Sequence, residues 1–110
     1  MKIAELEIYS EASNHAVVKP PGRQFPGIVV QGDSLAMLGA EAKELSERLK
    51  QLHIHDEELL CLAQGLQEQL LERQLHYQQV LAQHGVALPY SEPAKASDLV
   101  VLVPEGHNVP

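Results

Sequence analysis

Residues 32–52 have the sequence GDSLAMLGAEAKELSERLKQL, which sets the architecture of the chain. Apolar side chains recur in it at spacings of three and four residues, the period of a helix with one apolar face. These side chains are Leu35, Leu38, Ala42, Leu45, Leu49 and Leu52. Asp33 or Ser34 can accept hydrogen bonds from the free N–H groups of the first turn. The pattern therefore predicts a helix over 34–52.

A second and longer helix is predicted over 57–84. Asp56 can cap its start, and Gly85 suits the left-handed conformation that often ends a helix. One apolar face is marked by Leu59, Leu62, Ala63, Leu66, Leu70, Tyr77 and Leu81. Because only a short polar segment separates the two helices, we expect them to form an antiparallel hairpin.

Short runs with strand character lie on both sides of the helices. They are expected at 3–9, 15–19, 27–31 and 98–103. The run 27–31 is the most continuously apolar, which favours the centre of the sheet. We therefore predict an α+β fold, in which a small antiparallel sheet of three or four strands packs under the two-helix hairpin. Whether 98–103 completes this sheet or pairs with a partner stays open.

Size and charge limit the domain organisation and the partners. With 110 residues, the chain is expected to form one domain, with strands in 1–32, the hairpin in 33–85 and an extended tail in 86–110. Fifteen acidic and eight basic residues give a net charge of −7. Direct nucleic-acid binding is disfavoured, because affinity for phosphates comes largely from Lys and Arg. A basic protein partner is the better complement.

The cysteine count and the N-terminus indicate the compartment. Cys61 is the single cysteine, which rules out an internal disulfide and favours a reducing environment. The N-terminal residues MKIAELE are charged from the start and do not resemble a signal peptide. No apolar run approaches the roughly 20 residues of a membrane-spanning helix. A cytoplasmic protein without membrane association is expected.

The nearest approach to a chemical site is formed by His53, His55 and Cys61 between and within the two helices. A metal site needs three or four protein ligands, and no third histidine is adjacent in the sequence. A nucleophilic cysteine needs a base and an oxyanion site, which the spacing does not supply. We interpret these residues as structural, so no enzyme activity, metal or cofactor is expected. An enzyme or metal sensor using them is the alternative.

Leucines outside the main face of the second helix predict a binding surface. Leu60, Leu71 and Leu75 form an apolar flank beside this face. Together the face and the flank cover more of the helix circumference than one packing surface can bury. Exposed leucines at helical spacing usually bind a partner or a second copy of the chain. This flank therefore predicts a protein partner, with a homodimer through the second helix as the alternative.

Charged residues supply further candidates for partner contacts. Glu41, Glu44 and Glu47 are spaced to line one surface of the first helix, where they can meet a basic protein. Arg23 lies in the Pro-Gly turn between two predicted strands and is a candidate contact because we expect it to be exposed.

Two resemblances bear on the function. Residues 25–35, FPGIVVQGDSL, resemble the core of the HicB-type antitoxins, in which a strand after Pro-Gly leads through Gly-Asp into a helix. A wider resemblance is to an uncharacterised small bacterial family that shares the PGRxFPGxxxQGDSL and HGxxLPY patterns, here 21–35 and 84–90. The wider resemblance implies a small bacterial protein but brings no established activity.

The sequence thus favours a non-catalytic bacterial binding module. Its expected role is that of an immunity or antitoxin protein that neutralises a basic toxin or effector. This role rests on analogy with small acidic bacterial proteins rather than on site residues.

Overall fold

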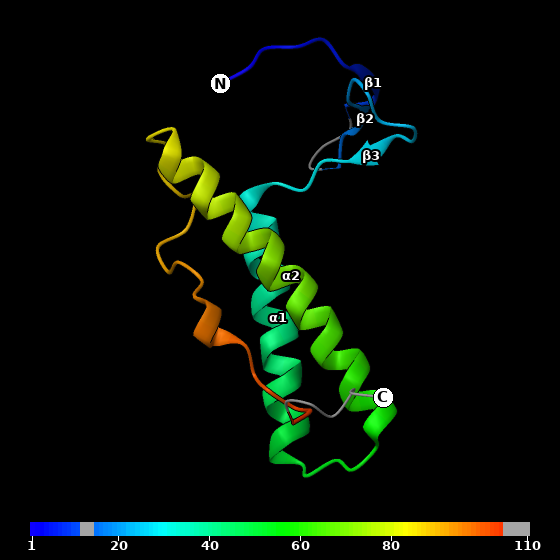
Figure 1. Cartoon of the computed structure of the whole chain (residues 1–110), viewed down its shortest axis with the longest axis vertical. Helices are drawn as coiled ribbons and strands as arrows, with labels where there is room; N and C mark the ends of the chain where they lie inside the picture. Colours follow the sequence, from blue (N-terminus) through cyan, green and yellow to red (C-terminus); the bar gives the residue numbers. More distant parts are fainter. Residues whose placement is uncertain (12–14, 105–110) are drawn as a thin grey trace.

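The structure is a computed structural model that describes residues 1–11 and 15–104. In chain order the elements are β1 (Glu7–Ser10), β2 (Val17–Lys19), β3 (Gly27–Ile28), α1 (Gly32–Gln51), α2 (Glu57–Gln83) and the 3-10 turn η1 (Ala96–Asp98). The three strands form one antiparallel sheet, and the two helices form the hairpin (Figure 1). The predicted α+β class and the long second helix are confirmed.

The ends of α2 form as the sequence predicts. The Asp56 carboxylate accepts a hydrogen bond from the Leu59 backbone N–H at 3.1 Å. After the helix, Gly85 has φ +66°, the left-handed conformation that glycine adopts without strain. The start of α1 differs, because it begins at Gly32 and its N-cap residue makes no side-chain capping bond. The predicted acceptor nevertheless forms inside the helix, because the Asp33 carboxylate accepts a hydrogen bond from the Ser34 backbone N–H at 2.9 Å.

Close contacts with small residues fix the register of α1 against α2. A Cβ atom added to Gly32 would overlap the phenol ring of Tyr77. A Cβ atom added to Gly39 would lie 2.7 Å from the amide oxygen of Gln74. Ser46 is fully buried at the same interface. The helices thus approach each other through small side chains, as Figure 1 shows for their backbones.

The sheet has β2 at its centre. Glu7 pairs with Lys19 across β1 and β2, and Val17 pairs with Ile28 across β2 and β3. The strand predicted over 27–31 is therefore an edge strand, contrary to the expectation from its apolar sequence. Within β1, the Tyr9 hydroxyl donates a hydrogen bond to the Glu7 carboxylate at 3.1 Å, which raises the pKa of Tyr9.

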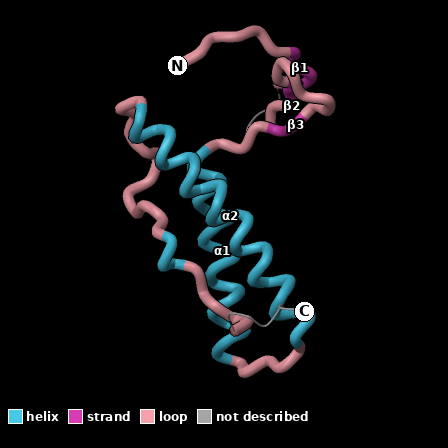
Figure 2. The backbone as a smooth tube through the Cα atoms, viewed as in Figure 1, coloured by secondary structure: helices cyan, strands magenta, loops and turns pink. Residues whose placement is uncertain are grey.

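The sheet contributes little buried surface. It lies beyond the end of the hairpin at which α1 begins (Figure 2). Ile8 remains 54% exposed and Ile28 remains 56% exposed. The helices are therefore covered mainly by another part of the chain.

That part is the segment 91–104, which we call the tail. It runs alongside the hairpin, with η1 as its only helical turn in the described residues (Figure 1). The strand predicted over 98–103 does not form, so neither completion of the sheet nor a separate tail strand is observed. Val103 at the end of this segment is only 6% exposed. The tail forms the third layer of the helical core.

Glutamine side chains of α2 bind the backbone of the tail. The Gln78 amide accepts from the Ala94 N–H at 2.8 Å and donates to the Ala94 carbonyl at 3.0 Å. Gln67 repeats the arrangement with the N–H and carbonyl of Val100, at 2.8 and 3.0 Å. These amides supply the donor and acceptor that a neighbouring strand would otherwise provide. The tail can therefore be buried without pairing to the sheet.

Candidate functional site

The apolar flank predicted on α2 is not free. Leu60, Leu71 and Leu75 are half-buried, because they lie on the side of α2 that faces the tail. Leu60 lines a hollow together with Val101 and Leu102 of the tail. The structure therefore leaves this flank half-buried rather than exposed, and its contact with a partner stays a prediction. Sequence spacing identified the flank but did not show that the tail covers it.

The exposed leucines of the hairpin lie elsewhere, at positions predicted to form the packed faces. We call this group the leucine strip. Its members and their exposed fractions are Leu38 at 44%, Leu45 at 48%, Leu52 at 69%, Leu59 at 40%, Leu62 at 67% and Leu66 at 49%. Leu38 and Leu45 belong to α1, Leu52 directly follows it as its C-cap residue, and the other three belong to α2. Scattered exposed leucines are ordinary, but a contiguous group indicates a binding surface.

Helical geometry places the strip on the side of the hairpin opposite the tail. Ser46 marks the side of α1 that faces α2, because its hydroxyl accepts a hydrogen bond from Gln67 at 3.2 Å. Successive residues are rotated by about 100° around a helix, so residues one and three positions before Ser46 fall on opposite flanks. Lys43, three positions before, forms an ion pair with Asp98 of the tail. Leu45, one position before, lies on the other flank.

The same relation holds on α2. Gln67 faces Ser46, and Gln64, three positions before it, accepts hydrogen bonds from the tail N–H groups of Leu102 and Val103 at 2.7 and 2.8 Å. Leu66, one position before Gln67, lies on the flank away from the tail. The leucines of the two helices therefore share one face of the hairpin.

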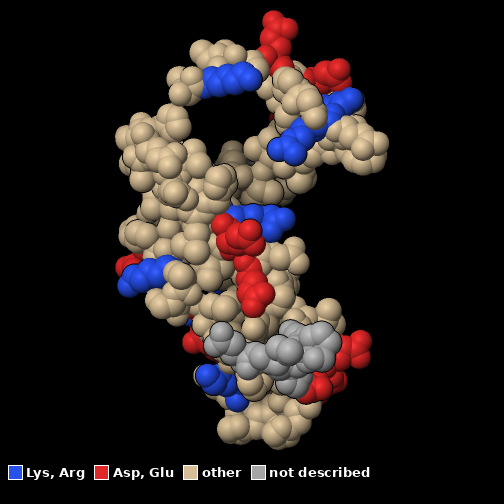
Figure 3. All heavy atoms as spheres, viewed as in Figure 1, with Lys and Arg blue, Asp and Glu red and all other residues tan. Residues whose placement is uncertain are grey.

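The three predicted acidic contacts are exposed on α1. Glu41, Glu44 and Glu47 all remain accessible, and Glu44 lies 4.0 Å from Arg48 in an exposed ion pair. Basic and acidic side chains alternate over the face seen in Figure 3, without a large patch of either sign. These carboxylates can attract a basic surface, but they do not converge on one point.

Arg23 lies in the turn between β2 and β3. Its N–H donates to the Pro20 carbonyl at 3.2 Å, and Gly22 next to it has φ +79°. The side chain is exposed beside Lys19 and Glu7 in a shallow hollow of the sheet. It is far in the fold from the hairpin, so the structure does not unite it with the other predicted contacts (Figure 1).

The two histidines lie in the connection between the helices. His53 has φ +53°, a left-handed conformation that is unusual for a residue other than glycine. His53 and His55 line one small hollow of about 200 Å³. Cys61, half-buried on α2, is not in its wall. Within residues 1–11 and 15–104, no group of three His, Cys, Asp or Glu side chains is placed to hold a metal ion.

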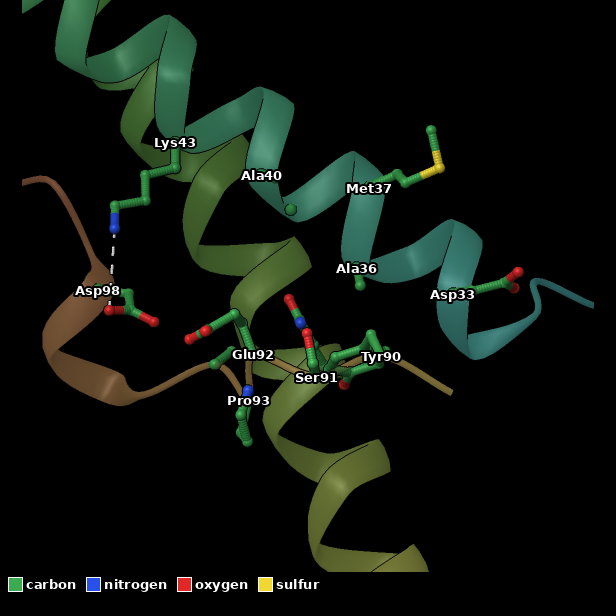
Figure 4. Close-up of a pocket in the computed structure, with 13 residues that line it drawn as sticks. Asp33, Ala36, Met37, Ala40, Lys43, Tyr90, Ser91, Glu92, Pro93 and Asp98 are labelled. Atoms are coloured by element: carbon green, nitrogen blue, oxygen red, sulfur yellow. Dashed lines mark ion pairs between the residues drawn. The ribbon is translucent and has the colours of Figure 1, made fainter. Parts of the chain in front are cut away.

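A cavity of about 550 Å³ lies between the first turns of α1 and the tail. Its wall includes the carboxylates of Asp33, Glu92 and Asp98. Figure 4 shows Asp33 at the opposite end of the cavity from Asp98, which pairs with Lys43 at 3.8 Å. The carboxylates are thus dispersed, and their arrangement does not form the close pair that acid–base catalysis commonly uses.

The chain was compared with known proteins. The model of a family of unknown function (DUF6959) matches residues 1–90. The chain belongs to this family. No curated protein and no solved structure matches the chain. The predicted membership of an uncharacterised small family is confirmed, whereas the resemblance of 25–35 to the HicB-type antitoxins stays a prediction.

The family match bears on the two sides of the hairpin. It includes β1 to β3, both helices and therefore all of the leucine strip. The tail from residue 91 onward lies outside the matched range. In the described part of the chain, no helix has the length and apolar character needed to cross a membrane.

Sequence reasoning missed the buried glutamines of α2. A buried polar residue within an apolar helix face is a recognisable feature, and Gln67 and Gln74 are 3% and 6% exposed. They lie seven residues apart, close to two helical turns, on the side of α2 that packs against α1. This spacing could have identified the buried side of the helix in place of the leucines.

Proposed function

We propose that this chain is a non-catalytic protein-binding module, and that its main binding surface is the leucine strip. One observation carries the proposal: six leucines of the hairpin share one face and keep 40 to 69% of their surface exposed. Proteins seldom leave a contiguous apolar surface of this kind open to water unless it binds something.

The free energy available from this surface supports a specific complex. Burial of apolar surface contributes about 25 cal/mol per Å², and complete burial of a leucine about 1.5–3 kcal/mol. Roughly half of that remains to be gained at each leucine of the strip, which amounts to about 1 kcal/mol per residue. Six such residues can offset much of the translational and rotational entropy lost on association.

In its most specific form, the proposal assigns the role of an immunity or antitoxin protein that neutralises a basic toxin or effector. The net charge of −7 and the exposed carboxylates Glu41, Glu44 and Glu47 support a basic partner. Charged groups at an exposed surface chiefly increase the association rate. These carboxylates would then supply the attraction at a distance.

The test is co-expression with the products of the genes next to that of this chain, followed by size-exclusion chromatography. We expect a stable complex whose association slows at least ~10-fold as salt rises from about 50 to about 500 mM. Replacing Glu44 and Glu47 with Gln should slow association in the same way. Association that does not respond to salt would contradict the basic partner.

The strip itself is tested by Leu62→Glu, with Val86→Glu as the matched control. Both residues are exposed, at 67% and 51%, but Val86 lies beyond α2 and outside the strip. We expect only Leu62→Glu to abolish binding of the polypeptide that covers the strip, because this substitution places a charge in the apolar contact. Equal loss of binding by both variants, or by neither, would remove the strip from the proposal.

A further inference from the structure

We propose that a second copy of this chain covers the leucine strip, with α1 of one copy antiparallel to α1 of the other about Leu45. The second copy is then the polypeptide that the strip binds, so this assignment rests on the proposed function. It concerns the face opposite the tail, which nothing else in the described residues covers.

The spacing of the strip on α1 is complementary to itself. Leu38 and Leu52 each lie seven residues from Leu45, close to two helical turns. A two-fold axis at Leu45 places Leu38 of each copy against Leu52 of the other, and Leu45 against its own copy. An isologous contact of this kind leaves none of these three leucines unpaired.

The charges beside these leucines select the antiparallel direction. Glu41 and Arg48 both lie on the outer edge of the strip, four residues before and three residues after Leu45. In the antiparallel pair, Glu41 of each copy faces Arg48 of the other, so the two-fold axis produces this contact two times. In a parallel pair, Glu41 would face Glu41, and like charges in contact disfavour that arrangement.

Arg48 is free to make this exchange. Its contact in the single chain is with Glu44 at 4.0 Å, and the two side chains are 71% and 70% exposed. Exposed pairs of this kind contribute little to stability. A second copy meets Arg48 with the opposite charge of Glu41. The charge pattern at the edge of the strip therefore fits the chain itself.

The α2 leucines fit the same assembly. Leu59, Leu62 and Leu66 lie on the face of the hairpin that carries the α1 leucines, so two hairpins meeting on this face form a four-helix bundle. The tail and the Lys43–Asp98 ion pair then lie on the outside of the bundle. Because Gln67 of α2 lies level with Ser46 of α1, the axis at Leu45 places the three α2 leucines against the second half of α2 of the copy.

The first experiment measures the molar mass of the full chain by light scattering and sedimentation from about 1 to about 200 µM. We expect a rise to that of two chains, and at least ~100-fold weaker association for Leu45→Glu, which brings two buried carboxylates together at the axis. Met37→Glu is the control, because Met37 is 65% exposed but lies outside the strip. The mass of a single chain throughout would overturn the assignment.

The second experiment tests the direction with exposed residues whose exchange leaves the fold intact. Glu41→Arg and Arg48→Glu should each weaken association about 5-fold, because each creates two like-charge contacts. The double variant restores both contacts with the charges exchanged, so it should associate as the original chain does. Two weakened single variants without rescue in the double variant would overturn the antiparallel arrangement.

The third experiment locates the axis by cross-linking. In a Cys61→Ser background, Leu45→Cys should form an intermolecular disulfide on mild oxidation, because its Cα atoms lie close across the axis. Met37→Cys should not. A chain that stays monomeric but binds another protein through Leu62 would overturn the second copy and retain the proposed function. If Leu62→Glu changes neither kind of binding, both proposals fail.

Discussion

The two sides of the helical hairpin are built from the same two helices, yet one side is covered by the tail and the other is exposed. On one side, Gln64, Gln67 and Gln78 of α2 bind the tail, and the residues beneath it are buried or half-buried. On the other side, six leucines remain 40 to 69% exposed. In this molecule the side on which the α2 amides bind the tail is covered, and the side with the leucine strip is open.

The difference follows from the hydrogen bonds that each side can offer to a segment that covers it. A buried chain segment brings backbone N–H and C=O groups away from water, and each must find a partner. A glutamine amide offers a donor and an acceptor together, which matches the backbone of one residue in the tail. Leucines can bury only apolar groups. The leucine side is suited to the side chains of another helix rather than to an extended segment of backbone.

The largest expected effect comes from the end of the tail. Val103 is 6% exposed and Val101 is 52% exposed, so the two valines form a matched pair. Val103→Asp should lower the free energy of unfolding by about 3 kcal/mol, because it places a carboxylate in an apolar contact. Val101→Asp should change it by less than about 0.5 kcal/mol. Urea unfolding followed by circular dichroism measures both, and equal values would contradict tail docking.

The next effect separates the glutamine bonds from apolar burial. Gln67→Leu keeps the size of the side chain but removes its bonds to Val100 and Ser46. We expect a loss of about 2 kcal/mol, because the groups left behind lose their hydrogen bonds. Gln79→Leu, at an exposed position of the same helix, is the control. A stabilised Gln67→Leu protein would show that the Gln67 bonds do not hold the tail.

A smaller effect tests the register that both sides share. Gly32→Ala adds a methyl group where the Tyr77 ring lies, and should cost about 1–2 kcal/mol as an overpacked contact. Gly65→Ala meets open space within a helix and should stabilise the protein by up to ~1 kcal/mol. Thermal unfolding of the two variants is the measurement. The same sign of change in both would place the helices in a different register.

Local sequence features predicted the helices well. The spacing of leucines identified both helices, and Asp56 and Gly85 marked the ends of α2, because capping depends on residues only a few positions apart. The prediction failed for the tail. The run at 98–103 has strand composition, and the sequence does not show that glutamines 20 to 40 residues earlier bind its backbone. Strand composition favours an extended chain, whichever partner provides the hydrogen bonds.

The sequence predicted exposed leucines on the second helix but placed them on the wrong side of it. Exposed leucines at helical spacing were expected, yet on Leu60, Leu71 and Leu75 rather than on Leu62 and its neighbours. A helix with apolar residues around most of its circumference has two possible buried sides, and periodicity alone does not choose between them. The choice depends on which side the tail occupies, which is a property of tertiary structure.

The smallest expected effect is the most direct evidence for the open side. Leu62→Gln should change the free energy of unfolding by less than about 0.5 kcal/mol at about 1 µM protein, because the side chain is 67% exposed in the single chain. At about 200 µM the same substitution should lower the unfolding temperature, since association stabilises the original chain by mass action. Calorimetry at the two concentrations measures this. A loss of stability that is equal at both concentrations would mean that Leu62 belongs to the core of the single hairpin, and the comparison between the two sides would then fail.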